Sequence, residues 1–424
     1  MEICPFVHGR ALRPPEFRGR SGELRRLLGR LATGQSTALI GQPHIGKTSF
    51  LNYLSDREAR QAIIGDKLDQ SIFAYIDSQM LGSSFNQAAF WKQVLSPLTS
   101  QFTTGAIYDV YKLAENNQFG AFTLEQLFSV FGKEGWQFVL LIDEFDALLT
   151  HAVLNSAEFY GGLRSLTSRC AGFTLVIASR RSLALLNQDT QKINPHGSPY
   201  FNVFTELQLG PLPKGHALEI LHQAEASFDR HDLEFLFRVS GRQPYLLQLA
   251  AAILWELNTQ GRQDAERYRD AAEELARQTR AHFTDAWNAW SNAEKKAVTT
   301  IALAQIPHLV EQHEFAAQHV SADLTDYSAE LRRLKEAGTI SEAGEQHWEI
   351  MQQAFLWWLA DEIKRVTRDV AGFEQWLCAH EIEVLFTKEE CAKLKTAAQK
   401  VGGLLGKGAT TLIETFAKGL GEAL

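Results

Sequence analysis

Eight consecutive residues near the start of the chain have the types and spacing needed to hold phosphate groups. They fit the pattern G-x-x-x-x-G-K-[ST] and read Gly41, Gln42, Pro43, His44, Ile45, Gly46, Lys47 and Thr48. The glycines let backbone N–H groups turn inward toward phosphate oxygens, and a helix beginning at Thr48 would add a favourable dipole. We expect Lys47 to reach the β- and γ-phosphates and Thr48 to ligate Mg²⁺. The segment from Gly41 to Ser49 is therefore predicted to bind ATP or ADP, with His44 at a variable position.

Two adjacent carboxylates form the second chemical feature. Asp143 and Glu144 follow the apolar run Phe138–Ile142 and lie 96 residues after Lys47. Such a run places an acid at the carboxyl end of a buried strand, where open α/β sheets bind ligands. We expect Asp143 to hold Mg²⁺, usually through water, and Glu144 to polarise the attacking water. The alternative is a helix N-cap with a solvated neighbour.

A third apolar run ends in polar residues that could lie beside the γ-phosphate. Ser179 is predicted to sense the nucleotide, and Arg180 to neutralise charge that develops in the transition state. The alternative is a strand that simply runs out into solvent. Arg164 and Arg169 precede this strand, either as arginine fingers for a neighbouring subunit or as solvated helix residues.

Five short apolar runs are predicted as the strands that position these groups. They are Ser36–Ile40, Ser71–Asp77, Gln137–Asp143, Phe173–Ser179 and Glu206–Leu209. Amphipathic segments such as Asn86–Gln101 and Ala157–Cys170 lie between them. This alternation predicts a doubly wound, parallel five-stranded α/β sheet covered by helices on both faces. A strand between the two motifs, together with the glutamate, favours an ATPase with an added central strand over a kinase or a GTPase.

Strand-like runs become scarce after Leu209-Gly-Pro-Leu-Pro213. We therefore predict an ATPase core over residues 1–211, an all-α lid over 212–285, a winged helix over 286–366 and a helical tail over 367–424. The winged helix rests on a helix at Asp323–Ala337, two short strands at 338–341 and 346–350, and a helix at Met351–Val366.

The tail carries an apolar stripe at helical spacing. Its members are Val401, Leu405, Leu412, Phe416, Leu420 and Leu424, and Gly402 with Gly406 form a G-x-x-x-G pair that permits close helix approach. Three interpretations stay open for residues 401–424. They are a helix docked on the protein's own surface or mediating oligomers, a segment that contacts membrane after activation, and a tag recognised by a partner protein.

The composition indicates a soluble globular chain, with 45% hydrophobic and 22% charged residues and a formal net charge of −8. The four cysteines lack zinc-ligand spacing, and no signal peptide or long apolar stretch is recognisable. We expect a cytoplasmic protein without a second enzymatic activity.

These motifs together resemble a known family. Phe17, Arg18, Gly19 and Arg20, followed by Glu23-Leu24, precede the phosphate loop, and the segments LLIDEFD and IASRR follow it. This order resembles AAA+ P-loop ATPases of the STAND and archaeal-ATPase type. The resemblance implies that Phe17 to Arg20 line the adenine pocket. Gly241-Arg-Gln-Pro244 is similar to the G-x-P element of STAND proteins, with one extra residue, and implies that Pro244 packs near the adenine.

The resemblance and the site together predict a slow, Mg²⁺-dependent ATPase that acts as a switch. Its ATP state would self-associate and signal, as such proteins often do in bacterial defence or programmed death. The alternative is a DNA-binding ATPase of the origin-recognition or transposition-regulator type, motivated by the winged helix and a basic N-terminal run. The net charge and the mixed acids and bases of residues 323–337 do not favour nucleic-acid binding.

Overall fold

The computed structural model describes residues 3–224, 228–262, 266–309, 324–344, 347–367, 375–376 and 388–421. The chain forms two compact units, Ala11–Leu209 and Met1–Arg10 with Gly210–Leu424, and we describe each by itself. The predicted end of the ATPase core at residue 211 lies two residues from this division. The first ten residues, however, belong with the second unit. The further boundaries at 285 and 366 stay predictions.

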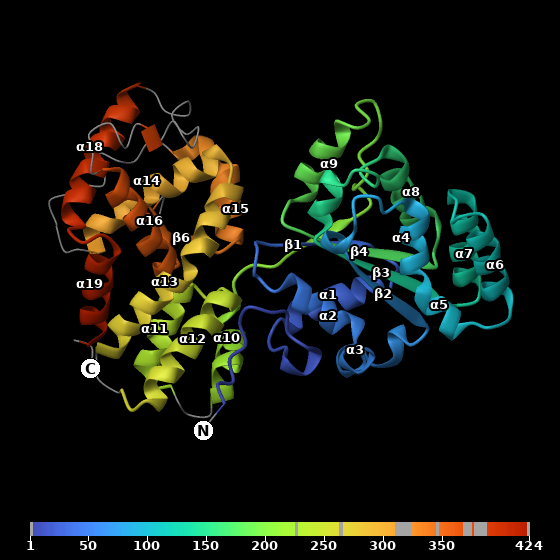
Figure 1. The fold of residues 1–424 in the computed structure, drawn as a ribbon, viewed down its shortest axis with the longest axis horizontal. Coiled ribbons are helices and arrows are strands. Elements are labelled where there is room, and N and C mark those ends of the chain that lie inside the picture. Colours follow the sequence, from blue (N-terminus) through green and yellow to red (C-terminus); the bar gives the residue numbers. More distant parts are fainter. Residues whose placement is uncertain are drawn as a thin grey trace. The chain divides into compact units, whose positions relative to one another are not determined.

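The first unit is built on a five-stranded parallel sheet (Figure 1). Its strands are β1 (Thr37–Ile40), β2 (Ser71–Asp77), β3 (Gln137–Asp143), β4 (Phe173–Ser179) and β5 (Thr205–Gln208), in the spatial order β2-β3-β4-β1-β5. All five predicted strands are confirmed, with ends shifted by at most one residue. The α/β P-loop fold is thus present.

The order of the strands refines the predicted central strand. β2, which lies between the two motifs in sequence, is at the edge of the sheet, and β4 is the strand that separates β1 from β3. Because the strands are parallel and in register, Ile40 lies beside Ser179, and Asp77 lies beside Asp143. The carboxyl ends of β1, β4, β3 and β2 therefore meet at one edge of the sheet.

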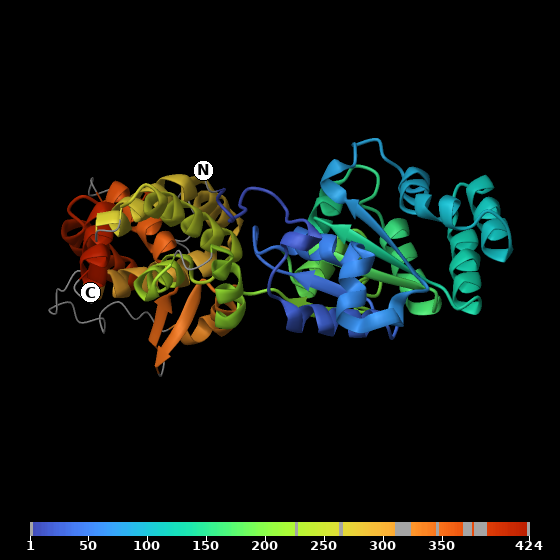
Figure 2. The same cartoon turned by 90° about the horizontal axis from the view of Figure 1, so that it is seen from below.

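Helices bury both faces of this sheet, which explains why its central strands are almost entirely apolar. One face packs against α1 and α2 through residues such as Leu39 and Leu141, and the other packs against α4, α7 and α8 through residues such as Ile40 and Leu140. The segment predicted at Asn86–Gln101 is two helices, α4 and α5. The hairpin of α6 and α7 lies at one end of this unit in both views (Figures 1 and 2). The helices are α1 (Ser21–Leu31), α2 (Lys47–Ser55), α3 (Arg57–Ile64), α4 (Gln87–Val94), α5 (Ser96–Gln101), α6 (Ala106–Asn116), α7 (Ala121–Lys133), α8 (Ala157–Arg169) and α9 (Leu183–Gln191), with 3-10 turns η1 (Pro14–Glu16), η2 (Gly65–Leu68), η3 (Ser78–Met80) and η4 (Phe145–Thr150).

The second unit is mainly helical and shares one hydrophobic core. The order α15, β6, β7, α16 is the one predicted for a winged helix, and β6 pairs antiparallel with β7. The predicted helix at Asp323–Ala337 is shorter, because Leu324–Tyr327 form a 3-10 turn before α15, and residue 323 lies outside the described residues. The elements are α10 (Lys214–Leu221), η5 (His222–Ala224), α11 (Arg230–Ser240), α12 (Pro244–Thr259), α13 (Glu266–Ala289), α14 (Asn292–Leu309), η7 (Leu324–Tyr327), α15 (Ser328–Glu336), β6 (Ile340–Gly344), β7 (His347–Ile350), α16 (Gln353–Val366), α18 (Lys388–Leu404) and α19 (Ala409–Gly421).

The N-terminal residues join the second unit through apolar and polar contacts. Phe6 is buried in its core and stacks on Phe228, with ring centroids 5.7 Å apart. The N–H of Val7 donates a hydrogen bond of 3.0 Å to Oε1 of Gln248 on α12. These contacts explain why residues 1–10 belong with a unit that resumes only at residue 210.

The tail helices are part of the same core. The apolar stripe is buried at each position that the structure describes, and Leu424 lies outside those residues; the buried members are Val401, Leu405, Leu412, Phe416 and Leu420. The ring of Phe416 contacts Phe235 and Trp357 at centroid distances of 5.9 and 5.5 Å. This arrangement agrees with the docked interpretation of the tail. Among the described helices, none has the length and apolarity needed to cross a bilayer.

The two glycines of the G-x-x-x-G pair have different roles. A Cβ at Gly402 would lie 2.2 Å from Oγ1 of Thr367 at the end of α16, so this glycine permits the close approach that the pattern predicts. Gly406 instead lies in the turn between α18 and α19, with a φ of +44°. At the start of α19, Oδ1 of Asp361 accepts the N–H of Ala409 at 2.7 Å and caps the helix.

Candidate functional site

The phosphate loop leaves β1 and turns into the first residue of α2. Gly46 has a φ of +97° and His44 a φ of +60°, so both lie in the left-handed region. A Cβ at Gly41 would meet Cγ2 of Ile45 at 2.7 Å and the carbonyl oxygen of Leu209 at 3.0 Å. The loop therefore needs glycine at 41 for space and at 46 for conformation.

Lys47 points its ammonium group back over this loop. Its Nζ donates to the carbonyl oxygens of Gly41 and Gln42 at 2.9 and 3.2 Å, and the side chain is buried. Burial lowers the pKa of Lys47, while the negative charges of Glu144, Asp143 and Asp146 act in the opposite direction. The sheet thus brings the lysine of one motif close to the carboxylates of the other, as predicted. Thr48 follows as the second residue of α2.

Asp143 is held at both carboxylate oxygens. Oδ1 accepts the backbone N–H of Glu144 at 2.9 Å, and Oδ2 accepts the hydroxyl of Tyr75 at 3.1 Å. The residue is only 1% exposed, so its orientation is set by these two donors. Sequence reasoning missed Tyr75. Tyr75 comes two residues before the end of β2. Its closeness to Asp143 follows from the register of the sheet, in which Asp77 lies beside Asp143.

Glu144 follows β3 in a left-handed conformation with a φ of 45°. Nε2 of Gln79 lies 3.4 Å from Oε2 of Glu144, another contact that the sequence did not indicate. Burial raises the pKa of Glu144, while the charges of Lys47 and Arg180 lower it. A carboxylate with a raised pKa between two cations fits a group that orients and polarises water.

Ser179 lies at the end of β4, and its hydroxyl is occupied by protein partners. Its Oγ donates to Oδ1 of Asp146 at 3.1 Å and accepts the N–H of Arg181 at 2.9 Å. The N–H of Arg180 donates to Oδ2 of Asp146 at 2.8 Å, while the Arg180 side chain is exposed. Asp146 therefore has a structural role at this edge of the sheet, and the sensor role of Ser179 stays a prediction.

The segment before the sheet packs on α2. The Phe17 ring lies 5.1 Å from Tyr53 and 6.2 Å from Phe50, measured between centroids, and it belongs to the core beneath this helix. The exposed Arg18 donates to the carbonyl oxygens of Pro15 and Phe17. Contact of residues 17–20 with adenine stays a prediction.

Two polar residues connect this N-terminal segment to the phosphate loop. The guanidinium of Arg20 is 3% exposed and donates to the carbonyl oxygen of Ile45 at 3.3 Å. Oγ of Ser49 accepts the N–H of Leu12 at 2.9 Å, so this hydroxyl anchors the incoming chain. The predicted contact of Ser49 with nucleotide would then be made by its backbone and not by its hydroxyl. Gly19 lies between, with a φ of +77°.

Pro244 belongs to the other unit, where it is the first residue of α12. The turn before it links α11 to α12, and Gly241 there has a φ of +56°. A Cβ at Gly241 would lie 2.7 Å from Cγ of Gln352, which explains the glycine by close packing within this unit. The role of Pro244 at the adenine stays a prediction.

The donor set at the carboxyl edge suits Mg²⁺. The ion prefers oxygen ligands and is usually held by one or two carboxylates together with substrate phosphates. Asp143 supplies a carboxylate and Thr48 a hydroxyl. Among the described residues, no group of three or more His, Cys, Asp and Glu side chains could hold a metal alone. A metal at this site would therefore be bound together with a nucleotide.

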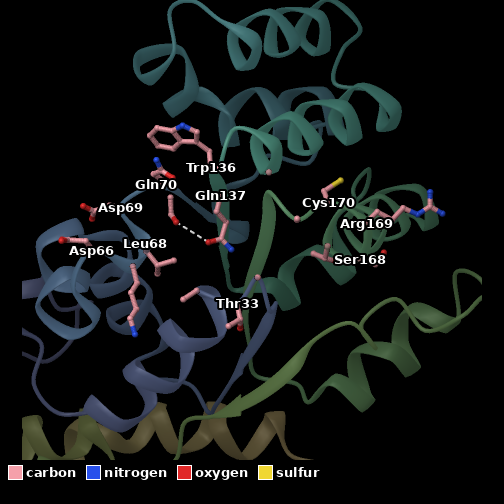
Figure 3. Close-up of a pocket in the computed structure, with 18 residues that line it drawn as sticks. Thr33, Asp66, Leu68, Asp69, Gln70, Trp136, Gln137, Ser168, Arg169 and Cys170 are labelled. Atoms are coloured by element: carbon pink, nitrogen blue, oxygen red, sulfur yellow. Dashed lines mark hydrogen bonds between the residues drawn. The ribbon is translucent and has the colours of Figure 1, made fainter.

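A hollow of about 940 Å³ opens at the edge of the sheet opposite to the phosphate loop, where the strands begin (Figure 3). Its lining includes Trp136, Gln137 and Arg169, and Arg169 lies 4.0 Å from Glu125. The amide of Gln137 donates to the Leu31 carbonyl oxygen and to Oγ1 of Thr174. Arg169 is thus at the edge away from the phosphate loop of its own chain.

Two of the three cations of α15 are paired with acids. Arg333 lies 2.8 Å from Glu330 and 3.5 Å from Glu294, and Lys335 lies 2.9 Å from Glu342. Such pairing reduces the positive field that a groove-reading helix needs. These contacts give no support to the DNA-binding alternative.

Comparisons with known proteins agree with the geometry of the first unit. The sequence model of the family described as Novel STAND NTPase 2 matches residues 34–306. The Walker-type ATPase of Pyrococcus abyssi has a similar structure, with a TM-score of 0.51 at 15% identity, covering 84% of this chain and 99% of that chain. The ORC2 protein of Aeropyrum pernix, in its ADPNP–ADP complexes, matches with a TM-score of 0.48 at 16% identity, covering 83% and 94%.

A STAND protein with a tetratricopeptide repeat sensor from Pyrococcus horikoshii matches with a TM-score of 0.37 at 15% identity, covering 96% of this chain and 52% of that chain. The comparison with curated proteins finds no match. At these identities the first solved structure supports the fold, and the family model supports membership.

Proposed function

Because the chain belongs to the Novel STAND NTPase 2 family, whose model covers residues 34–306, we propose that it is an ATP-driven switch. In this proposal the protein binds ATP with Mg²⁺, hydrolyses it slowly, and self-associates only in its ATP state. Signalling in bacterial defence or programmed death, a cytoplasmic location and a partner for the tail are further parts of this proposal.

The observation that carries the proposal is the meeting of two motifs at one sheet edge. The negative charges of Glu144 and Asp143 are close enough to Lys47 to raise its pKa against the effect of burial, and the charge of Lys47 lowers the pKa of Glu144. In the proposed reaction Lys47 would bind the β- and γ-phosphates, and Thr48 and Asp143 would hold the metal. When bound, Mg²⁺ would neutralise charge on the phosphate oxygens. Glu144 would orient and polarise the attacking water.

The second unit supports the switch part of the proposal. Within the described residues it contains no metal-ligand cluster, and its apolar tail stripe is buried in its own core. We propose that a site for hydrolysis joined to a large, mainly helical unit serves timing rather than rapid turnover. The winged helix, the lid and the ATP-state surface belong to this proposal as well.

Hydrolysis is tested by phosphate release from ATP with Mg²⁺ or with EDTA. We expect slow release that requires Mg²⁺ and is lost in Lys47→Ala and in Glu144→Gln. Glu144→Gln should still bind ATP, because it keeps the phosphate loop and Lys47, whereas Lys47→Ala should bind ATP more weakly. Release that is equal in Lys47→Ala and the unchanged protein would contradict the ATPase assignment.

Self-association is tested by size-exclusion chromatography with light scattering. The Glu144→Gln protein is measured with Mg²⁺-ATP and with Mg²⁺-ADP, and Lys47→Ala serves as the control that binds neither tightly. We expect a larger mass for Glu144→Gln in ATP alone. An identical mass in both nucleotides would overturn the oligomeric switch while leaving the ATPase assignment intact.

A further inference from the structure

We infer that Tyr75 is a positioning residue of the nucleotide site, whose hydroxyl orients the Asp143 carboxylate to receive the metal–nucleotide complex. This inference rests on the proposed function, because it assigns a role within the same site. It concerns a residue outside both sequence motifs, on the strand at the edge of the sheet.

The register of the sheet explains how Tyr75 reaches Asp143. Asp77 on β2 lies beside Asp143 on β3, and Tyr75 lies beside Leu141. Side chains two residues apart on a strand point to the same face, and a diagonal neighbour lies about 7–8 Å away. A tyrosine spans that distance, and its hydroxyl lies 3.1 Å from Oδ2 of Asp143.

Two hydrogen bonds orient the Asp143 carboxylate and still leave it able to bind a metal ion. Oδ1 accepts from the N–H of Glu144, and Oδ2 accepts from Tyr75. A carboxylate has about four acceptor positions, so lone pairs remain on both oxygens for water or a metal. Without the tyrosine hydroxyl, only the backbone bond to Oδ1 would oppose rotation of the Asp143 carboxylate, since torsions of this type have broad preferences.

The backbone of Tyr75 is held by the sheet, because β2 pairs with β3 and Tyr75 lies beside Leu141. A phenol hydroxyl carries its proton at neutral pH, so it can donate a hydrogen bond to the carboxylate.

Tyr75 acts through Asp143 and so should affect the metal more than the nucleotide. Partners that orient a metal ligand typically change metal affinity by about tenfold or more when they are removed. Nucleotide binding in EDTA, which depends on the phosphate loop and Lys47, should be unchanged. A merely structural role would weaken both kinds of binding together.

The experiment compares Tyr75→Phe with the unchanged full-length protein. Mn²⁺ affinity is measured by electron paramagnetic resonance in the presence of a non-hydrolysable ATP analogue, and a fluorescent ATP analogue is titrated in EDTA. We expect about tenfold weaker Mn²⁺ binding in Tyr75→Phe and the same affinity in EDTA. Tyr111→Phe on α6, a tyrosine of the same unit that lies outside the sheet, is the control and should match the unchanged protein.

A double-mutant cycle keeps the inference testable if Tyr75→Phe is less stable. In an Asp143→Asn background the Tyr75→Phe change should no longer alter Mn²⁺ affinity, because the group it orients is gone. Equal Mn²⁺ affinity in Tyr75→Phe and the unchanged protein would overturn the inference alone. Failure of the unchanged protein to bind nucleotide in any condition would overturn the proposed function and this inference with it.

Discussion

Oγ of Ser179 lies 3.1 Å from Oδ1 of Asp146, and Oδ2 of the same carboxylate accepts the N–H of Arg180 at 2.8 Å. Asp146 belongs to η4, directly after the acidic pair, whereas Ser179 ends the neighbouring strand β4. The Asp146 side chain therefore connects the end of β3 to the end of β4 through two hydrogen bonds. These bonds hold the backbone of Arg180 in place near Glu144.

Asp146→Ala should destabilise the first unit. The change leaves the N–H of Arg180 without its acceptor, at about 1–3 kcal/mol, and it removes one of the two acceptors of the Ser179 hydroxyl, the other being the carbonyl oxygen of Arg181 at 3.0 Å. Urea unfolding followed by circular dichroism measures the loss. Asp146→Asn keeps one carbonyl acceptor and should lose less. An Asp146→Ala variant as stable as the unchanged protein would show that these hydrogen bonds do not contribute to the stability of the first unit.

Gly41→Ala should disrupt the phosphate loop. The new methyl group would lie 2.7 Å from Cγ2 of Ile45 and 3.0 Å from the Leu209 carbonyl oxygen. Forcing such contacts typically costs about 1–3 kcal/mol, and we expect nucleotide binding to be lost as the loop shifts. Thermal unfolding and titration with a fluorescent ATP analogue measure the two effects.

Gly29→Ala on α1 is the matched control for this change. A Cβ at Gly29 would have nothing within 4 Å, and the residue lies inside a helix. We expect this variant to be more stable by about 0.5–1 kcal/mol and to bind nucleotide normally. Two variants with the same loss of stability would show that crowding at Gly41 is not the cause.

Glu144→Gln should raise thermal stability at neutral pH. The folded pKa of Glu144 is raised above 4.5 by burial, so the folded state binds this proton more tightly than the unfolded chain does. The charged form therefore destabilises the fold as the pH rises through the folded pKa, and glutamine removes that effect. We expect an increase in Tm of a few degrees at most, since about 1 kcal/mol corresponds to 2–4 °C in a domain of this length.

The pH series makes this prediction specific. The difference in Tm between Glu144→Gln and the unchanged protein should be present at pH 7 and should vanish below pH 4.5, where both states carry the proton. Differential scanning calorimetry at four or more pH values records it. A difference that grows toward low pH would have the wrong sign.

Asp361→Ala should loosen the last helix of the tail. The carboxylate caps α19 by accepting the N–H of Ala409 at 2.7 Å, and removal of such a cap costs about 1 kcal/mol. Amide hydrogen exchange over residues 409–421 should accelerate several-fold. Glu362→Ala removes the neighbouring acid, which is paired with Arg365 and Arg280, and should leave exchange in α19 unchanged. Equal acceleration in both variants would contradict the capping role.

The sequence predicted the parts of the site that depend on local patterns. The phosphate loop and the acidic pair each combine a motif with an apolar run, so their strands were predicted correctly and their chemical roles could be proposed. The position of β2 at the sheet edge could not be assigned, because strand order depends on which helices cross which face. The same limit applied to the tail, where periodicity predicted a stripe but left its partner open.

Three contacts of the site could not be predicted from the sequence, and they are made by Tyr75, Gln79 and the hydroxyl of Ser49. Each acts through a partner that is distant in the chain, namely Asp143, Glu144 and Leu12. Tyrosine in a strand or serine in a helix carries no local sign of such a partner. Only the register of the sheet and the path of the N-terminal segment bring these groups together.

The docking of the first residues onto a unit that begins at residue 210 has a consequence for biosynthesis. The hydrogen bond of Val7 to Gln248 cannot form until Gln248 has been synthesised, and Gln248 is 241 residues later in the chain. At about 5–20 residues per second a ribosome needs on the order of ten to fifty seconds to cover that interval. The first unit is synthesised before Gln248, so its chain is available to fold during this interval. The bond between Val7 and Gln248 can form only after α12 has been made, so docking of the first residues is a late step of maturation.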